Sequence, residues 1–533
     1  MSLRTPLALP PSGYVRTADV ISALSIAADF ALGLPAEHSA RSCYIAIRIA
    51  QELRLSIERQ GEVYYTTLLL DAGCTAWTSA FAAYLIGDEI VARTELYFGT
   101  NVRDPLAIAD WLRHYMAPGA AIPRRAERFA DFLLNGRERM REGFRNTCAV
   151  SSRFAERLGM PATVQEALMH VFEQWDGEGM PDGAAGASVP VAARIAHLAI
   201  FAEFAQRRGN RDEALQIVLE RRGKSFDPTV VDTFEAVAAD PAFWERLEQA
   251  TVLELVRSLE PAVPYRFIPE ARLLDMALFA ADFTDLKSRF TLGHGRRVAA
   301  TAVAAARAMS LPEPAIRSIQ LAALLHDLGL VAVPSFVLEK ADRQRTPAEQ
   351  ETLRLHPYHA ERILARIAAL EEVAALVGAH HERIDGRGYY RGLAGPRIPL
   401  GARVLAVVDV FDELTHDRPG QPALDPSAAL SVMQADVGSA FDPEVWAAFL
   451  STIPAAQPRM TTAPTPDRPA GLTTREVEVL RLAATGMTRK EIANRLFVSQ
   501  STVRSHLEHI YAKIGVSTRA AATLFAVEHN LIA

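Results

Sequence analysis

Histidine and aspartate side chains are concentrated in one part of this sequence, between residues 294 and 409. The set comprises His294, His326, Asp327, His356, His380, His381 and Asp409. Neighbouring side chains on a helix diverge by about 100°, so the adjacent pairs His326-Asp327 and His380-His381 suit two neighbouring metal ions. Imidazole and carboxylate donors without a thiolate favour Fe, Mn, Zn or Ni over a structural zinc site. The alternative, that these residues bind no metal, applies better to any single histidine than to the whole set.

Two metal ions about 3.5–4 Å apart suit phosphoester hydrolysis, because they activate a bridging water and stabilise the attacking and leaving oxygens. A carboxylate can bridge two such ions, and Asp327 is placed to do so between flanking imidazoles. Asp327 and His326 are therefore the predicted catalytic residues.

Buried helices must position these ligands. In AIRSIQLAALLHDLG, Ile316, Ile319, Ala323 and His326 recur at helical spacing, which places His326 on a buried face close to a possible helix end at Gly329. RVLAVVDVFDEL predicts a second buried helix that delivers Asp409. The glycine-rich stretch DGRGYYRGLAG predicts a loop beside His380 and His381 that shapes a substrate mouth. The predicted substrate-binding residues there are Arg383, Asp385, Gly388, Tyr389 and Arg391.

Residues 273–450 resemble the HD-GYP subgroup of HD-domain phosphohydrolases. The resemblance places the family's ligands on the seven residues named above and implies two divalent metal ions, Fe or Mn. It also implies hydrolysis of a cyclic dinucleotide such as cyclic di-GMP.

Three positions depart from the family's pattern. Leu330 stands where HDxGK has a phosphate-binding lysine, GYP reads Gly388-Tyr389-Tyr390, and Phe290 replaces a glutamate that some members use for a third metal. Losing a charge-assisted hydrogen bond costs about 1.5–3 kcal/mol, which Arg383 or Arg391 could partly replace. Three functions stay open: a phosphodiesterase, a nucleotide receptor without turnover, and a hydrolase of a different phosphoester.

The first half of the chain repeats the second. His38 precedes Asp71 by 33 residues, as His294 precedes Asp327, and LLLDAG at 68–73 matches LLHDLG at 324–329. Residues 172–200 align without a gap with 381–409. The aligned ligand positions read His38, Leu70, Asp71, Thr147, Val171, Phe172 and Ile200. Five of the seven ligands are lost, and about 47 extra residues lie between 74 and 146. This copy is either a sensory or dimerising domain or a remnant that covers an apolar face.

A proline-rich linker at 454–470 separates a small C-terminal domain with four helical patterns. Thr474, Thr488 and Ser499 are the predicted helix caps. Residues 471–533 hold eight Lys and Arg against five Asp and Glu, so they carry +3 while the remainder carries −9. This asymmetry of charge favours binding of nucleic acid by residues 471–533.

The tail resembles the LuxR/NarL/GerE helix-turn-helix domain. The resemblance implies binding of double-stranded DNA. We expect a homodimer, because a single small domain binds DNA too weakly. It places the contacts on Thr488, Arg489, Lys490, Ser501, Thr502, Arg504, Ser505 and Glu508, with Val503 and Leu507 facing the core.

A length of 533 residues predicts a multidomain protein, and its net charge is −6. The helical periodicity of its segments predicts an all-α fold. We expect two HD-type domains in tandem, 1–270 and 271–453, followed by the helix-turn-helix domain 471–533. Cys43, Cys74 and Cys148 have no ligand-like spacing and favour a reducing cytoplasm. The sequence predicts neither a signal peptide nor a membrane span.

Overall fold

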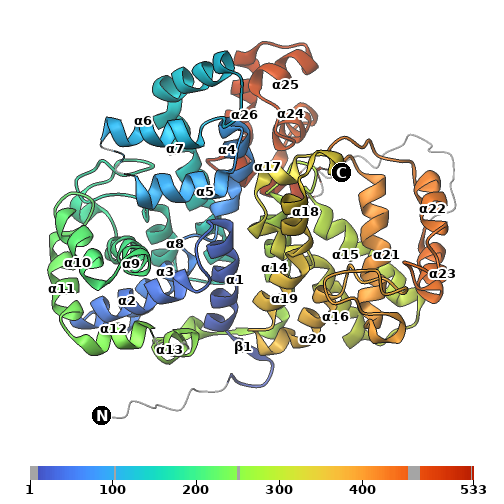
Figure 1. Cartoon of the computed structure of the whole chain (residues 1–533), viewed down its shortest axis with the longest axis horizontal. Helices are drawn as coiled ribbons and strands as arrows, with labels where there is room; N and C mark the ends of the chain where they lie inside the picture. The colour runs from blue at the N-terminus through green and yellow to red at the C-terminus, as the bar shows by residue number, and fades with distance from the viewer. Residues whose placement is uncertain are drawn as a thin grey trace. The chain divides into compact units, whose positions relative to one another are not determined.

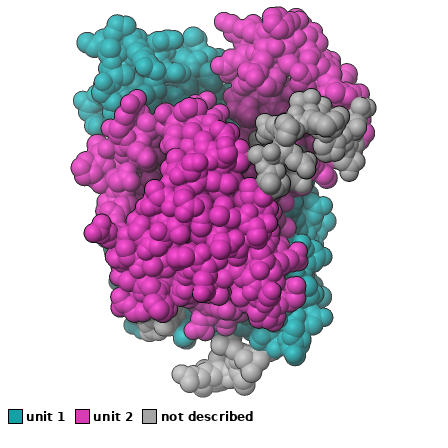
Figure 2. All heavy atoms as spheres, turned by 90° about the vertical axis from the view of Figure 1, so that its right-hand side faces the viewer, with its two compact units in different colours: residues 1–276 teal, residues 277–533 magenta. Residues whose placement is uncertain are grey.

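The computed structural model describes residues 10–100, 102, 104–248, 252–453, 469–529 and 531–532. The described chain is almost entirely helical, as predicted, and divides into two compact units, Met1–Met276 and Ala277–Ala533 (Figures 1 and 2). Residues 454–468 of the predicted linker 454–470 lie outside the described residues. The three cysteines are buried and reduced.

Unit 1 consists of helices and one small antiparallel sheet, in which Val15 pairs with Ile268. Its main elements are β1 (Tyr14–Arg16), α1 (Thr17–Ala31), α2 (His38–Glu52), α3 (Ile57–Leu69), α4 (Thr78–Leu85), α5 (Glu89–Thr94), the π-helix η2 (Glu95–Gly99), α6 (Pro105–Tyr115), α7 (Ile122–Arg157), α8 (Ala162–Met169), α9 (Val191–Arg208), α10 (Arg211–Glu220), α11 (Pro228–Ala238), α12 (Pro241–Glu248), α13 (Val252–Ser258) and β2 (Phe267–Pro269). Helix α14 (Leu273–Asp285) spans the division between the units.

Unit 2 carries the histidine-rich helical domain and the small C-terminal domain. Its main elements are α15 (His294–Ala308), α16 (Glu313–Leu325), the 3₁₀ helix η6 (Leu328–Ala332), α17 (Ser335–Leu338), α18 (Pro347–Arg354), α19 (His356–Leu364), α20 (Glu371–Gly378), α21 (Leu400–Thr415), α22 (Pro426–Gln434), α23 (Pro443–Thr452), α24 (Thr474–Ala484), α25 (Arg489–Leu496), α26 (Gln500–Ile514) and α27 (Arg519–Glu528). Helices α15, α16 and α21 contact one another and form the centre of the histidine-rich domain.

The internal repeat is visible in matching backbone contacts. In unit 1 the amide of Asp176 donates to the carbonyl of Lys224 at 2.9 Å; in unit 2 the amide of Asp385 donates to the carbonyl of Ser439 at 2.8 Å. The helices α2 and α15 both have 15 residues, and both follow a residue with a φ of 75°. The two halves therefore share one helical fold.

The extra residues of the first half form helices of their own. Helices α4, α5 and α6 and the first part of α7 fill the insertion that the sequence predicts between 74 and 146. They pack around a separate apolar cluster that includes Phe81, Tyr84 and Trp111, with Phe129 and Phe132 of α7 against it. Figure 1 shows α7 as a long helix next to α6.

The C-terminal domain has its own core, in which Val477, Leu480, Ile492, Val503 and Ile510 are buried together. Thr488 and Ser499 cap α25 and α26, and Gly515 ends α26, as predicted. The cap of α24 is Thr473 and not Thr474. Thr473 forms a reciprocal capping box with Glu476, which satisfies two backbone donors at once.

One stretch, Glu313–Ala332, has the length and hydropathy of a membrane span. It contains His326 and Asp327, and 67% of its most apolar window is buried inside the protein. The central helix of a folded domain passes the same test, so the stretch is weak support for a membrane span.

Candidate metal centre

Four of the five histidines in the predicted ligand set have one ring nitrogen held by a fixed acceptor. Nδ1 of His294 lies 2.7 Å from a carboxylate oxygen of Asp412. Nδ1 of His326, His356 and His380 lies 2.8, 2.7 and 2.6 Å from the backbone carbonyls of Ala323, Leu353 and Val377. Because these acceptors take the proton of Nδ1, Nε2 is the nitrogen of each ring that remains to bind a cation.

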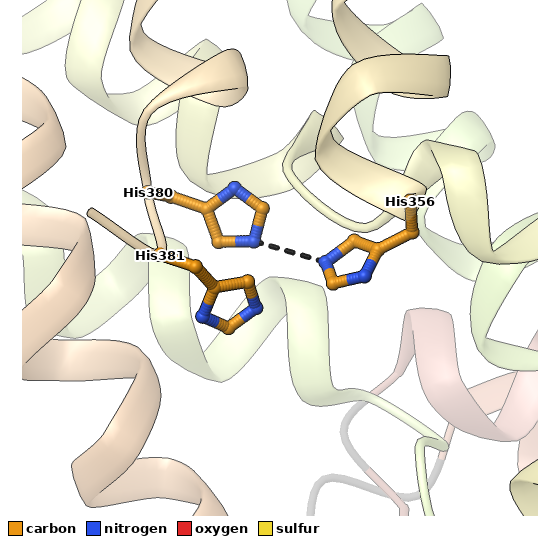
Figure 3. Close-up of side chains that lie close together, drawn as sticks. All are labelled: His356, His380 and His381. Carbon is orange, nitrogen blue, oxygen red and sulfur yellow. Dashed lines mark hydrogen bonds between the residues drawn. The ribbon is translucent and has the colours of Figure 1, made fainter. Parts of the chain in front are cut away.

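The Nε2 atoms converge in pairs. The Nε2 atoms of His294 and His326 are 3.2 Å apart, and those of His356 and His380 are 3.1 Å apart. Figure 3 shows the second pair, with the ring of His381 beside it. Two nitrogens bound to one ion at about 2.1 Å lie about 3.0–3.4 Å apart. The spacing of the facing Nε2 atoms therefore fits a shared cation.

Asp327 connects the two histidine pairs. Its Oδ1 lies 3.3 Å from Nε2 of His356, and its Oδ2 lies 3.5 Å from Nε2 of both His294 and His326. Oδ1 of Asp409 lies 3.2 Å from Nε2 of His294. Three groups of ligand atoms within 4.8 Å result: His356, His380 and His381; His294, His326 and Asp327; and His326, His380 and Asp409. All seven predicted ligands belong to these groups.

The electrostatics differ between the two sides of the centre. Burial lowers the pKa of His381 to about 3 and that of His380 well below its ordinary value, so both rings are neutral. Burial opposes charge on His294, yet hydrogen bonds to Asp409 and Asp412 raise its pKa well above the ordinary value. For Asp409, hydrogen bonds with His294 and His326 outweigh burial and lower the pKa. The carboxylate side thus has a negative potential that a divalent cation would neutralise.

Two residues that the sequence analysis missed orient the first ligand. Asp412, one turn after Asp409 on α21, holds His294, and Arg297 donates to both oxygens of Asp412 at 2.8 and 3.0 Å. Such a carboxylate behind a metal-binding histidine fixes the ring and its tautomer. Asp412 could have been found from the sequence, because its i to i+3 spacing from Asp409 places both carboxylates on one helix face.

The predicted substrate-binding residues lie in the loop after His381. Tyr389 stacks on the ring of His381, with the centroids 4.8 Å apart. A Cβ atom on Gly388 would lie 2.5 Å from the backbone of Glu382 and Arg383, so this position needs glycine. Arg383 pairs with Asp385 at 3.0 Å and with Asp436, and Arg391 pairs with Glu361. Of these residues, Tyr389 is in ring contact with a predicted metal ligand.

Leu330 is part of an apolar cluster. Its side chain is 6% exposed and packs with Val333, Val337 and Leu338. The position therefore contributes to the core next to the metal centre, where the resemblance would have placed a phosphate-binding lysine.

Unit 1 keeps the frame of this site without its ligands. His38 and Asp71 remain, while Leu70, Val171, Phe172 and Ile200 are buried apolar residues. The π-helix η2 of the insertion places Tyr97 and Phe98 there: their rings lie 5.5 Å from Phe172 and 5.8 Å from His38, respectively. Among the residues that the structure describes, every group of three potential metal ligands lies in unit 2.

The predicted DNA contacts lie on the surface of the C-terminal domain. Ser501, Thr502, Arg504, Ser505 and Glu508 are exposed along α26, and Arg489 and Lys490 are exposed at the start of α25. Val503 and Leu507 face the core from the other side of α26. Thr488 caps α25 through a capping box with Glu491. The predicted DNA contacts thus lie on the exposed face of α26 and at the N-terminal end of α25.

Family models match both halves of the chain and the C-terminal domain separately. The family model "HD domain" matches residues 135–230 and 280–445, one segment in each half. The model "Bacterial regulatory proteins, luxR family" matches residues 470–526. The chain is therefore a tandem HD-domain protein of the HD-GYP type, with a degenerate first copy, fused to a luxR-type helix-turn-helix domain.

Its relatives are cyclic dinucleotide phosphodiesterases. The 3′3′-cGAMP-specific phosphodiesterase 3 of Vibrio cholerae serotype O1 is 29% identical over 432 residues, which cover 81% of this chain and 93% of that protein. A cyclic di-GMP phosphodiesterase of Pseudomonas aeruginosa is 40% identical over 168 residues, 31% of this chain and 39% of that protein. The crystal structure of a cyclic GMP-AMP specific phosphodiesterase from V. cholerae matches with a TM-score of 0.59 and 27% identity, over 83% of this chain and 98% of that one.

Proposed function

We propose that residues 271–453 form a metal-dependent phosphodiesterase that hydrolyses a cyclic dinucleotide, within a transcriptional regulator. The observation that carries the proposal is the placement of Asp327, whose two carboxylate oxygens face different histidine groups. A carboxylate between two sets of imidazoles is the arrangement that a binuclear centre requires.

The ligand residues divide into two sets with Asp327 between them. His294, His326 and Asp409 would hold one divalent ion, and His356, His380 and His381 the other. Ions held there, Fe or Mn, would activate water for attack on phosphorus. Asp327 spans both sites, Asp412 keeps His294 in the required tautomer, and Tyr389 shapes the entrance.

Two substrates of one chemical class are candidates. The V. cholerae relative that matches both halves of the module is named for 3′3′-cGAMP, which favours that dinucleotide. The P. aeruginosa relative, which matches a shorter part at 40% identity, is named for cyclic di-GMP. Both have guanine and two phosphodiester bonds, so the proposed chemistry at phosphorus is the same.

A product assay tests this proposal. Full-length protein is loaded with Mn or Fe without oxygen, and each dinucleotide is followed by chromatography. We expect linear dinucleotide from the wild type and none from Asp327→Ala, whereas His38→Ala should retain turnover because its site has lost five of the seven ligands. Failure of the metal-loaded wild type to cleave either substrate would reject the enzyme assignment.

The C-terminal domain supports a proposal of its own. Residues 471–533 would bind double-stranded DNA through α26 in the major groove, with Arg504 as the base-reading residue and Lys490 as a phosphate contact. We expect a homodimer, since paired domains read paired half-sites. We also expect the protein to lie in the cytoplasm. Binding of promoter DNA should weaken steeply with salt through counterion release; salt-independent binding would contradict the proposal.

A second candidate function is a nucleotide receptor without turnover. The burial of Leu330 in an apolar cluster favours it, because the lysine of the family's motif is missing. The same assay separates the two: a receptor would bind the dinucleotide, measured by calorimetry, and leave it intact.

A further inference from the structure

Large apolar side chains lie exposed on the insertion of unit 1. Among the residues that the structure describes, five such side chains are at least 74% exposed, and four of them belong to α6 and α7. Those four are Leu106 at 80%, Ile122 at 83%, Leu133 at 74% and Leu134 at 82%. Single exposed apolar residues are ordinary, but a group of them on neighbouring helices marks an interaction surface.

The exposed apolar residues of α7 form one continuous stripe. This α7 stripe consists of Ile122, Ala126, Ala130, Leu133 and Leu134, all of them exposed. Steps of three or four residues bring such positions to one side of a helix. At a rise of 1.5 Å per residue the stripe is about 18 Å long. A different side of α7 carries Phe129 and Phe132, which pack on the aromatic cluster of the insertion, and the stripe itself faces solvent.

Leu106 of α6 widens the stripe at its leucine end. The guanidinium of Arg125 donates to the carbonyl of Arg113, and the rings of Trp111 and Phe132 lie 5.6 Å apart. Contacts between α6 and α7 therefore run in opposite directions along the two helices. Because Leu106 comes before Trp111 on α6, it lies beside the part of α7 that follows Phe132, where the two exposed leucines are.

Charges of both signs lie beside the α7 stripe. Glu127 and Glu138 are exposed there, together with Arg137, whose guanidinium lies 3.2 Å from the carboxylate of Glu178. The side chains of Arg137 and Glu178 are 64% and 62% exposed, so their ion pair contributes little and Arg137 can exchange its partner. The two glutamates disfavour a surface of anionic lipids, whereas a protein surface with both signs of charge would match them.

We propose that the α7 stripe is an interface between two copies of this chain, in which the two α7 helices pack antiparallel. Under a twofold axis every contact occurs twice. In the register that packs Ala130 on the partner subunit's Leu134, Glu127 faces the partner subunit's Arg137, because both pairs are centred on the same point of α7. The small side chain of Ala130 allows the helices to approach closely.

This interface would join two chains and thereby pair their DNA-binding domains, as paired half-sites require. The inference therefore deepens the proposed homodimer, on which it rests, by naming the surface that forms it. It also assigns a role to the insertion in the degenerate copy, which places the stripe on the outside of unit 1.

Sedimentation equilibrium of the full chain without DNA, at micromolar concentration, tests the interface. We expect a dimer for the wild type, and Leu134→Glu should raise the dissociation constant of the dimer at least tenfold. Leu219→Glu is the control, because it makes the same change at a leucine of α10 that is 40% exposed, and it should leave the dissociation constant unchanged. Thermal unfolding checks that each variant is folded.

Charge reversal tests the antiparallel register. Glu127→Arg and Arg137→Glu should each weaken the dimer severalfold, because each change places like charges opposite one another at two positions. Both changes in one chain should restore the dimer, since the two ion pairs form again with their signs exchanged.

Three results would overturn the inference: a wild type that is monomeric without DNA, a Leu134→Glu variant that dimerises as tightly as the wild type, or a double charge reversal that is no tighter than the single ones. A monomeric wild type that sediments with vesicles of anionic phospholipid would assign the stripe to a membrane surface instead. A chain that binds promoter DNA as a dimer and is unaffected by the α7 changes would reject this interface and leave the DNA-binding proposal standing. A wild type that dimerises through α7 and binds no DNA would do the reverse.

Discussion

Glu203 accepts a hydrogen bond from Nδ1 of His38 in the interior of unit 1. Asp412 and His294 form the same pair in unit 2, and an arginine three residues after each histidine, Arg41 or Arg297, donates to the carboxylate. The histidine–carboxylate pair is therefore kept in unit 1, where four apolar residues stand at the positions of metal ligands. We infer that it stabilises the fold, apart from any role in holding metal.

The first prediction follows from this difference between the halves. His38→Ala should lower the free energy of unfolding by about 3 kcal/mol or more, because it leaves the buried carboxylate of Glu203 without one of its partners. The metal content should stay at the wild-type value. His294→Ala is the matched variant, and it should reduce the metal content. Equal metal loss in both variants, measured by mass spectrometry of the metals, would contradict the assignment.

Leu330 allows a test of the missing lysine. Leu330→Lys should not restore faster turnover, and it should lower stability by about 2 kcal/mol or more, because the ammonium group would enter an apolar cluster. Leu330→Met conserves volume and should cost less than about 1.5 kcal/mol. Thermal unfolding and kcat/KM of the two variants check this; a gain in kcat/KM for Leu330→Lys would refute it.

Arg354 lies over the ring of Tyr389, one of the predicted substrate-binding residues. Its guanidinium carbon lies 4.8 Å from the centre of the Tyr389 ring, and this ring also stacks on His381. Removing a cation–π contact of about 0.5–1 kcal/mol should raise KM two- to fivefold in Arg354→Ala and leave kcat unchanged. Arg354→Lys should show a smaller rise. A fall in kcat with unchanged KM would show that Arg354 acts on the chemical step instead.

Arg504 and Glu508 form an ion pair on the exposed face of α26, with the nitrogen and oxygen 2.8 Å apart. Glu508→Gln should free Arg504 for DNA and remove a negative charge from the interface. If one more phosphate contact forms, the slope of log affinity against log salt should become steeper by about 0.9. Lys490→Ala should change the slope by the same amount in the opposite direction. An unchanged slope in Glu508→Gln would exclude this role of the pair.

The capping box of α24 predicts a pH dependence of stability. Burial opposes charge on Glu476, but hydrogen bonds with Lys513 and Thr473 lower its pKa to about 2 from the ordinary value of 4.5. A lowered pKa means that the carboxylate stabilises the folded domain above pH 4.5 and loses this effect as the pH falls towards 2.

Glu476→Gln should therefore lower the free energy of unfolding of the 471–533 fragment at pH 7, by about 1.5–3 kcal/mol. The difference from the wild type should shrink between pH 4.5 and pH 2. Chemical denaturation followed by circular dichroism measures it, and a difference that is constant with pH would rule out the ionised carboxylate as its cause.

Residue type and spacing were enough to predict the repeat and the seven candidate ligands, and the resemblance to two known families predicted the two kinds of domain. Helical periodicity places His326 and Asp409 on buried faces, and ligands on buried faces meet when the helices pack. The capping box Thr473-x-x-Glu476 was also in the sequence and indicates Thr473, although Thr474 was predicted as the cap.

Only the tertiary structure decided which atoms face each other. The split of the Asp327 oxygens between two histidine groups, and the pairing of His294 with Asp412 118 residues away, depend on how helices pack. The sequence could show that five ligands of the first copy were lost, but not that η2 of an insertion would place Tyr97 and Phe98 there. Packing between distant segments follows from shape complementarity in a dense core, which no local pattern in the chain encodes.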